Sequence, residues 1–196
     1  FSPKLWNRKT CEELEKEIEC VWDKKLQNCK VYNGQKFRYA GNEIDKNVFK
    51  LNLGMTCYRD IIGISQSQNV QTWKTMGEEN FGNSQAYLSN GLGVGILAFT
   101  DDDHIVLIRR AKWVGEYPGF FDRPGGHPEP EKVPDIQENP QAKETHASIA
   151  NEIWNSPVDE LVEEVGVSSD QIESPKLLGT VQNLSLPGRP SLEFLT

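Results

Sequence analysis

The 196-residue sequence predicts an α/β protein in two parts, a small unit over residues 1–90 and a larger domain over residues 91–196. Three observations predict this class. Near the N-terminus, an amphipathic helical pattern precedes two short alternating strand patterns. At Gly91 the composition changes and an apolar hairpin pattern begins. A long helical pattern then leads into the acidic stretch Asp159–Val167, and two further strand patterns follow it.

The first part is expected to contain one long helix and two strands. Thr10-Cys-Glu-Glu13 matches a capping box, and apolar residues recur after it at helical spacing, which predicts a helix over residues 11–27. Lys36–Ala40 and Val48–Leu53 have strand patterns. Thr56 is then positioned to cap a short helix that turns Ile61 and Ile62 inward. Residues 64–90 indicate a long polar connector with a helical segment around residues 70–76.

The second part is expected to supply most of the sheet. Leu92–Phe99 and His104–Arg110 are predicted to form a hairpin around the turn Asp101–Asp103. Another short strand is expected near Gly119–Phe121, before a Pro-Gly-Gly turn. The last two predicted strands, separated by a Pro-Gly turn, are Leu177–Ser185 and Ser191–Thr196.

Residues 143–166 carry a helical pattern that contains one conflict. Pro157 lacks an N–H and its ring clashes with the preceding turn, which costs about 3 kcal/mol inside a helix. The helix is therefore expected to kink there, or to restart with Ser156 as its N-cap. Either arrangement leaves residues 158–165 helical, and Gly166 then ends the helix.

The composition limits the classes of partner. The net charge of −8 argues against broad contact with a nucleic-acid backbone, because that contact requires a cationic surface. No run of about 18 apolar residues occurs, so no membrane span is expected. The four cysteines include no Cys-x-x-Cys pair, which argues against zinc, and scattered thiols are typical of a reducing, cytoplasmic setting. The chain ends within a strand pattern, so we expect its C-terminus to be incomplete.

The acidic stretch Asp159–Val167 is the main candidate for chemistry. Glu160, Glu163 and Glu164 stand at positions i, i+3 and i+4 and so share one helix face. Three carboxylates on one face repel each other unless a cation neutralises them, and oxygen ligands are those that Mg²⁺ or Mn²⁺ prefers. The competing interpretation is an ordinary solvated acidic face.

Two motifs together resemble a Nudix hydrolase. They are Pro118–His127, with the sequence PGFFDRPGGH, and Glu160–Val167. The family box is Gly-x5-Glu-x7-Arg-Glu-U-x-Glu-Glu-x-Gly-U, where U is aliphatic. Gly126 corresponds to its first glycine, and its second half is matched by Glu160, Leu161, Glu163, Glu164, Gly166 and Val167.

The chain departs from the family box in two ways. Asp159 stands in place of the arginine that normally holds one carboxylate, so it adds negative charge instead. The loop after the first glycine is also longer than in the family. Spacing therefore leaves three candidates for the first glutamate of the box, which are Glu129, Glu131 and Glu152.

A wider set of motifs resembles the branch of this family that cleaves UDP-glucose and UDP-galactose, from about residue 20 to the end of the chain. Its motifs are Tyr58–Asp60, the run Ala86–Gly95, Ile108–Arg110 and, most distinctively, Gly125–Pro130. The resemblance implies a Nudix α/β/α sandwich around a mixed sheet, preceded by an N-terminal unit that helps to hold the nucleoside. It also implies Mg²⁺-dependent cleavage of a nucleotide-sugar substrate to UMP and a sugar 1-phosphate.

With this resemblance, Glu160 and Glu164 are expected to hold the metal ion, and Glu163 is the third ligand candidate. His127 and Glu129 lie in the loop that leads out of Pro-Gly-Gly and is expected to face the metal helix. One of the two is expected to bind phosphate and the other a metal-bound water. The general base stays open between Glu129 and Glu164.

Arg110 ends a predicted strand and offers paired donors for a phosphate, with Arg123 as a weaker candidate. The alternative for Arg110 is a surface charge. Tyr32 and Tyr58 are expected to stack on the uracil ring, and the alternative for both is core packing.

Three functions stay open at this point. The first is UDP-sugar hydrolysis, and the second is hydrolysis of another nucleoside diphosphate derivative. The third is a catalytically weak, Nudix-like module that binds nucleotide, which Asp159 favours and the three retained glutamates disfavour. The sequence leaves the sugar preference and the oligomeric state open.

Overall fold

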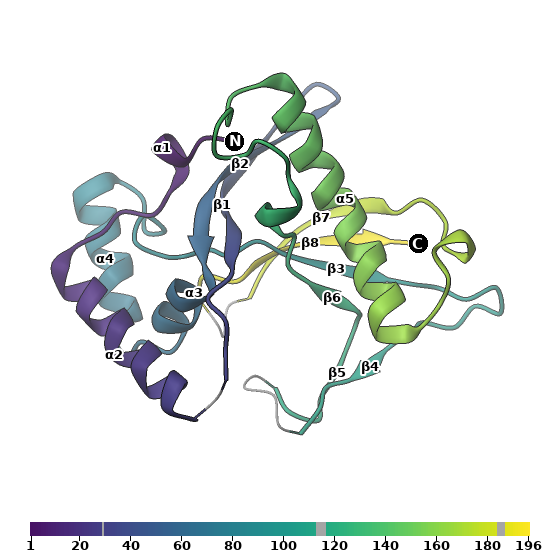
Figure 1. Ribbon diagram of the computed structural model, residues 1–196, viewed down its shortest axis with the longest axis horizontal. Coiled ribbons are helices and arrows are strands. Elements are labelled where there is room, and N and C mark those ends of the chain that lie inside the picture. The colour runs from purple at the N-terminus through teal and green to yellow at the C-terminus, as the bar shows by residue number, and fades with distance from the viewer. Residues whose placement is uncertain (29, 113–116, 184–186) are drawn as a thin grey trace.

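The computed structural model shows a mixed α/β molecule (Figure 1). It describes residues 1–28, 30–112, 117–183 and 187–196. The main sheet has four strands in the order β6-β3-β8-β7. β3 (Gly93–Leu97) runs parallel to β8 (Pro190–Leu195) and antiparallel to β6 (Gly125–Gly126), and β7 (Lys176–Gln182) is antiparallel to β8. The predicted α/β class with a mixed sheet is confirmed, and the three-layer sandwich stays a prediction.

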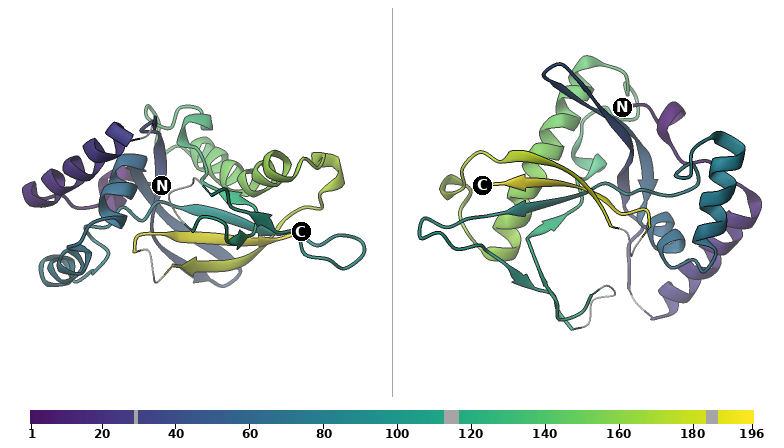
Figure 2. Two further views of the ribbon diagram at one scale, coloured as in Figure 1. Left: turned by 90° about the horizontal axis from the view of Figure 1, so that it is seen from below. Right: turned by 180° about the vertical axis from the view of Figure 1, so that it is seen from behind.

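α5 (Lys143–Val165) lies on one face of this sheet and packs on β3 and β6 (Figure 2). The helix runs through Pro157 as one element, so the predicted restart at Ser156 is wrong. The reason is burial: Pro157 lies on the same buried stripe as Ile153 and Leu161, and this apolar contact offsets the lost hydrogen bond. Gly166 ends the helix with a φ of 81°, as predicted.

The predicted hairpin around Asp101–Asp103 is only partly confirmed. Thr100 and His104 close the turn through backbone hydrogen bonds, and Phe99 forms an isolated bridge with Ile105. The returning segment does not continue along β3, because β6 and β8 already occupy the two edges of that strand. Its last residues instead form β4 (Ile108–Arg109), which pairs with β5 (Phe121–Asp122) in a separate ribbon.

The N-terminal part has more helix and longer strands than predicted. Its elements are α1 (Pro3–Trp6), α2 (Glu12–Asn28), β1 (Gln35–Asp45), β2 (Val48–Cys57), α3 (Tyr58–Ser65) and α4 (Val70–Phe81). The predicted cap at Thr56 is wrong, because Thr56 is a buried residue of β2 and α3 begins only at Tyr58. The remaining short helices are η1 (Pro130–Lys132) and η2 (Ser169–Gln171).

One hydrophobic core joins the two predicted parts. Phe37 and Leu53 of the β1–β2 hairpin pack in the same cluster as Val94 of β3 and Phe194 of β8. The buried guanidinium of Arg38 also donates to the carbonyl oxygens of Trp6, Gln85 and Leu88. The hairpin is therefore fixed against the sheet. A second cluster lies among α2, α3 and α4.

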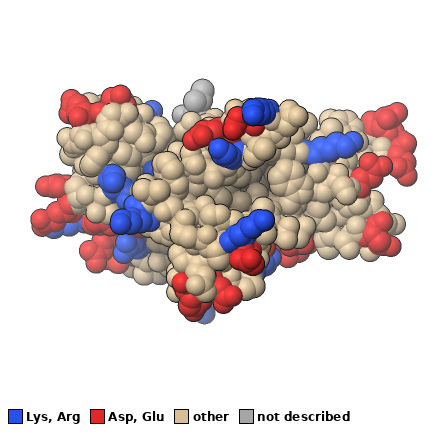
Figure 3. All heavy atoms as spheres, turned by 90° about the horizontal axis from the view of Figure 1, so that it is seen from above, with Lys and Arg blue, Asp and Glu red and all other residues tan. Residues whose placement is uncertain are grey.

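The surface carries charges of both signs. On the face drawn in Figure 3, lysines and arginines stand singly or in small groups among acidic side chains. Across the described ranges, no helix is both long and apolar enough to cross a membrane.

Gly63→Ala tests how closely α3 packs on α2. A Cβ at Gly63 would lie 2.8 Å from Cγ2 and 2.9 Å from Cα of Ile18. Glycine-to-alanine changes usually stabilise a helix by up to about 1 kcal/mol, but overpacking here should reverse the sign and lower the free energy of unfolding by about 1–3 kcal/mol. Urea unfolding measures this change.

Gly34→Ala is the matched control, because its Cβ would meet nothing closer than 3.5 Å. Its free energy of unfolding should stay within about 0.5 kcal/mol of the wild type. Equal stability of Gly63→Ala and the wild type would contradict the close contact between the two helices.

Candidate active site

The acidic end of α5 lies directly against β6. The Gly125 N–H donates to Glu164 Oε2 over 3.0 Å. A Cβ on Gly126 would overlap the carboxylate of Glu160. The two carboxylates can therefore approach β6 this closely because its two residues carry no side chains.

Four glutamates influence one another at this point. Desolvation raises the pKa of Glu160 above its usual value, and the negative charges of Glu164, Glu163 and Glu129 raise it further. A hydrogen bond from the backbone N–H of His127 partly opposes this shift. The predicted carboxylate face of α5 is thus joined by Glu129 from the loop after β6.

The structure separates the three candidates for the first glutamate of the box. Glu129 belongs to the carboxylate group around Glu160. Glu152 accepts a hydrogen bond from the Glu129 backbone N–H over 2.8 Å and so supports the loop. Glu131 accepts from the Gln35 N–H over 2.9 Å, which ties the loop to β1.

Two lysines offset part of this negative charge. Lys132 Nζ lies 3.6 Å from Glu129 Oε2 and 3.7 Å from Asp159 Oδ2. Lys36 Nζ of β1 lies 3.7 Å from Glu129 Oε1. Partial desolvation lowers the pKa of Lys132, but nearby carboxylates outweigh it and the net shift is upward. Asp159 therefore pairs with a cation of the loop rather than only adding repulsion.

The donor chemistry of this group fits a hard divalent cation, because carboxylate oxygens from a helix and a loop converge. Glu160, Glu163, Glu164 and Glu129 are the residues that would hold it. In residues 1–28, 30–112, 117–183 and 187–196, however, no three Asp, Glu, His or Cys side chains already form a metal-binding group. Two of the carboxylates, Glu164 and Glu160, accept backbone hydrogen bonds from Gly125 and His127.

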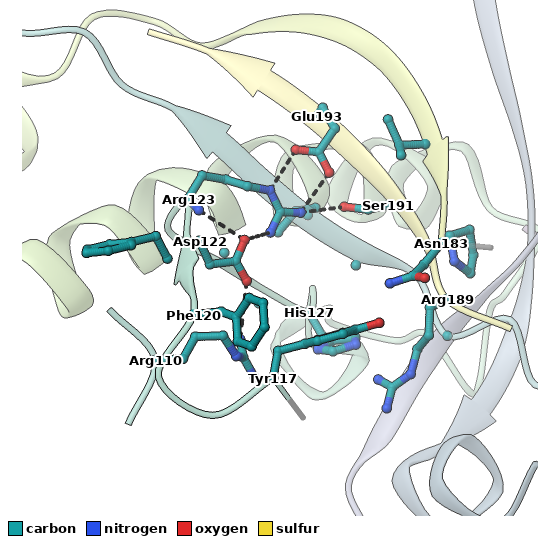
Figure 4. A pocket seen from close by; sticks show the side chains of 18 residues that line it. Arg110, Tyr117, Phe120, Asp122, Arg123, His127, Asn183, Arg189, Ser191 and Glu193 are labelled. Carbon is teal, nitrogen blue, oxygen red and sulfur yellow. Dashed lines mark hydrogen bonds and ion pairs between the residues drawn. The ribbon is translucent and has the colours of Figure 1, made fainter. Parts of the chain in front are cut away.

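A cavity of about 780 Å³ opens beside β6 (Figure 4). This volume is within the usual range for small-molecule sites. Its charged lining residues are Arg110, Arg123, Arg189, Asp122 and Glu193, and its other lining residues include Tyr117, Phe120, Gly125, Gly126, His127, Asn183 and Ser191. Arginines therefore outnumber carboxylates here, although the chain as a whole is acidic.

An ion-pair chain crosses one wall of the cavity (Figure 4). Arg123 donates to both carboxylate oxygens of Glu193, at 2.9 and 2.7 Å, and to Asp122 Oδ1 at 3.1 Å. The other oxygen of Asp122 lies 3.3 Å from Nη1 of Arg110. Arg123 is thus a structural guanidinium, and Arg110 is oriented by Asp122.

His127 is held neutral at the cavity wall. Desolvation lowers its pKa to about 4, and the positive charges of Arg189 and Lys36 act in the same direction. A neutral imidazole has one donor and one acceptor nitrogen. Sequence reasoning did not identify Arg189, although its position after the Pro187-Gly188 turn was an available indication.

The two predicted base-stacking tyrosines do not line this cavity. Tyr32 is 83% exposed and borders a separate hollow with Glu131, Asp135 and Glu138. Tyr58 packs edge-to-face on Trp22, with ring centroids 6.0 Å apart. The aromatic rings that do line it are Tyr117, Phe120 and Phe121. The sequence predicted a short strand near Gly119–Phe121 but gave none of these rings a role.

Comparison with known proteins confirms the resemblance. The chain is 34% identical over 187 residues to uridine diphosphate glucose pyrophosphatase NUDT22 of Bos taurus, covering 92% of this chain and 64% of that protein. It is 37% identical over 149 residues to the Homo sapiens protein of the same name, covering 74% and 48%. It is 33% identical over 195 residues to Nudix hydrolase 9 of Arabidopsis thaliana, covering 92% and 62%.

The chain is therefore a homologue of these proteins, and it spans less than two thirds of the length of each of them. No family model matches the sequence.

Gly126→Ala tests whether the carboxylates of α5 hold a metal ion. The new Cβ would displace the flexible end of Glu160 and not the backbone, so the fold should survive. We expect Mn²⁺ affinity, measured by electron paramagnetic resonance, to fall at least about tenfold. Gly34→Ala, whose Cβ meets only ordinary contacts, serves again as the control. Unchanged Mn²⁺ affinity in Gly126→Ala would remove Glu160 from the ligand set.

His127→Gln tests the neutral state of His127 through stability. The folded-state pKa is about 4 against an ordinary 6.5, so below pH 6.5 the unfolded chain binds a proton that the native chain does not. Wild-type stability should therefore fall relative to His127→Gln as the pH drops from about 7 to about 5. Urea unfolding at both pH values measures the difference, and a constant difference would refute the shift.

Proposed function

We propose that this chain, a homologue of Nudix hydrolases, hydrolyses the diphosphate bond of UDP-sugars such as UDP-glucose and UDP-galactose. The products would be UMP and a sugar 1-phosphate, and the cofactor Mg²⁺ or Mn²⁺. The observation that carries the proposal is the contact of the carboxylate-bearing end of α5 with Gly125 and Gly126, which also line an arginine-containing cavity. The printed names of the bovine and human relatives support the choice of substrate.

Different residues of the chain would bind the phosphates and hold the metal ion. Arg110, oriented by Asp122, offers paired N–H donors to phosphate oxygens in the cavity. Neutral His127 offers a further hydrogen bond without adding charge. Mg²⁺, when bound by the glutamates, would neutralise phosphoryl charge and lower the pKa of a water nucleophile.

Glu129 and Glu164 remain the two candidates for the general base that accepts a proton from water. Glu164 is fixed by the Gly125 N–H, and Glu129 is flanked by Lys36 and Lys132.

A nucleotide-binding module without turnover is the second candidate function. It is favoured by the two lysines beside Glu129, which already neutralise a carboxylate that a metal ion would otherwise use. The two functions differ in one measurable outcome, since the module would bind UDP-glucose and release no UMP.

Incubation with UDP-glucose and Mg²⁺, followed by product analysis, tests the proposal. We expect UMP and glucose 1-phosphate in equal amounts. Glu164→Gln should lower kcat at least about tenfold, because it removes a charged ligand. Glu144→Gln is the matched control, since Glu144 lies exposed in the first turn of the same helix.

Three outcomes would change the assignment. Binding of UDP-glucose without UMP release would favour the module. Faster cleavage of ADP-ribose than of UDP-glucose would replace the uridine assignment with another nucleoside diphosphate derivative. Unchanged turnover in Glu164→Gln would remove Glu164 from the metal site.

A further inference from the structure

Two aromatic side chains project into the cavity from one turn (Figure 4). Tyr117 is 41% exposed and Phe120 is 64% exposed, and their rings meet edge-to-face with centroids 6.0 Å apart. Large aromatic side chains are normally covered, because each buries about 150–250 Å² on packing. An exposed pair at a cavity is therefore a surface that suits a flat ligand.

Backbone hydrogen bonds hold the described residues next to this aromatic pair. The Arg110 N–H donates to the Phe120 carbonyl over 2.9 Å, and the Gly119 N–H donates to the Arg110 carbonyl over 3.0 Å. Tyr117 itself has a φ of 46°, which is uncommon for a bulky residue. Phe120 is thus held beside Arg110 by backbone hydrogen bonds before a ligand arrives.

The rest of the cavity matches the remaining parts of a uridine nucleotide. Asn183 has an amide with both donor and acceptor groups, which is the pairing that the imide edge of a pyrimidine requires. Arg110 and Arg189 supply positive charge for phosphate oxygens in the same space.

The alternative position at Tyr32 lacks these features. The hollow beside Tyr32 is lined by Glu131, Asp135 and Glu138, and by no lysine or arginine among the residues that the structure describes. If the base stacked on Tyr32, these three carboxylates would repel the negatively charged diphosphate attached to it. Tyr58 already has a ring partner in Trp22.

We propose that Tyr117 and Phe120 form the base-binding subsite, on which the uracil ring of the substrate stacks, and that they determine the preference for a nucleotide. This inference rests on the proposed function for the identity of the base. It assigns the base to these two residues just before β5 and not to the N-terminal unit.

The test compares two probes that differ only by the base, UMP and ribose 5-phosphate, by calorimetry without metal or turnover. Tyr117→Leu and Phe120→Leu should each weaken UMP binding by about 5- to 150-fold, the usual contribution of one stacked base. They should change ribose 5-phosphate binding less than about twofold. Phe120→Tyr keeps an aromatic face and should retain UMP binding.

Tyr32→Leu is the matched control, because Tyr32 is more exposed than either ring and lies outside the cavity. It should leave the affinity for UMP unchanged. The inference is overturned if Tyr32→Leu lowers the affinity for UMP and Phe120→Leu does not. It is overturned too if Tyr117→Leu and Phe120→Leu lower the affinities for UMP and ribose 5-phosphate equally. It is also overturned if the wild-type protein fails to bind UMP.

Failure of this inference is distinguishable from failure of the proposed function. If the wild type releases UMP from UDP-glucose while Tyr117→Leu and Phe120→Leu bind UMP as tightly as the wild type, the proposed hydrolysis stands and the proposed subsite is rejected. Selective loss of UMP affinity in these variants, without UDP-glucose hydrolysis by the wild type, would support the subsite and remove the catalytic proposal.

Discussion

The close approach of β6 to the acidic end of α5 is the constraint on which the rest of the site depends. Burial of Ile153 and Leu161 against the sheet fixes the helix, and this leaves Glu160 and Glu164 directed at the backbone of β6. Desolvating these carboxylates and gathering their like charges is unfavourable, and both effects raise the pKa of Glu160. The arrangement holds because backbone N–H groups donate to these carboxylates and lysines stand beside Glu129.

The N-terminal hairpin contributes to this arrangement through β1. Its Gln35 N–H holds Glu131, and its Lys36 stands beside Glu129, so two consecutive residues of β1 contact the loop that follows β6. The hairpin can do this because Phe37 lies in the shared core and Arg38 is buried among carbonyl oxygens. A unit that the sequence was expected to use for the nucleoside therefore supports the loop that carries Glu129 and Glu131.

Local periodicity predicted those parts of the structure that depend on neighbouring residues. The buried stripe of α2 and the carboxylate face of α5 follow from helical spacing alone. Pairing between distant segments was not predictable in this way. The partner of β4 depends on β8 occupying an edge of β3, and the direction of Glu131 depends on β1. Tyr117 and Arg189 are some seventy residues apart in the chain and meet only in the folded cavity.

Gly125 and Gly126 show why a motif of two glycines is needed here. Neither adopts a positive φ, so their conformational freedom is not what the site uses. A Cβ on Gly125 would lie 2.5 Å from the carbonyl oxygen of Val94 and would push β6 away from β3. A Cβ on Gly126 would occupy the position of the Glu160 carboxylate. Gly125 thus allows β6 to pair closely with β3, and Gly126 leaves room beside β6 for the Glu160 carboxylate of α5. Both glycines also line the cavity. At these two positions only backbone atoms would therefore lie between the carboxylates and a ligand in the cavity.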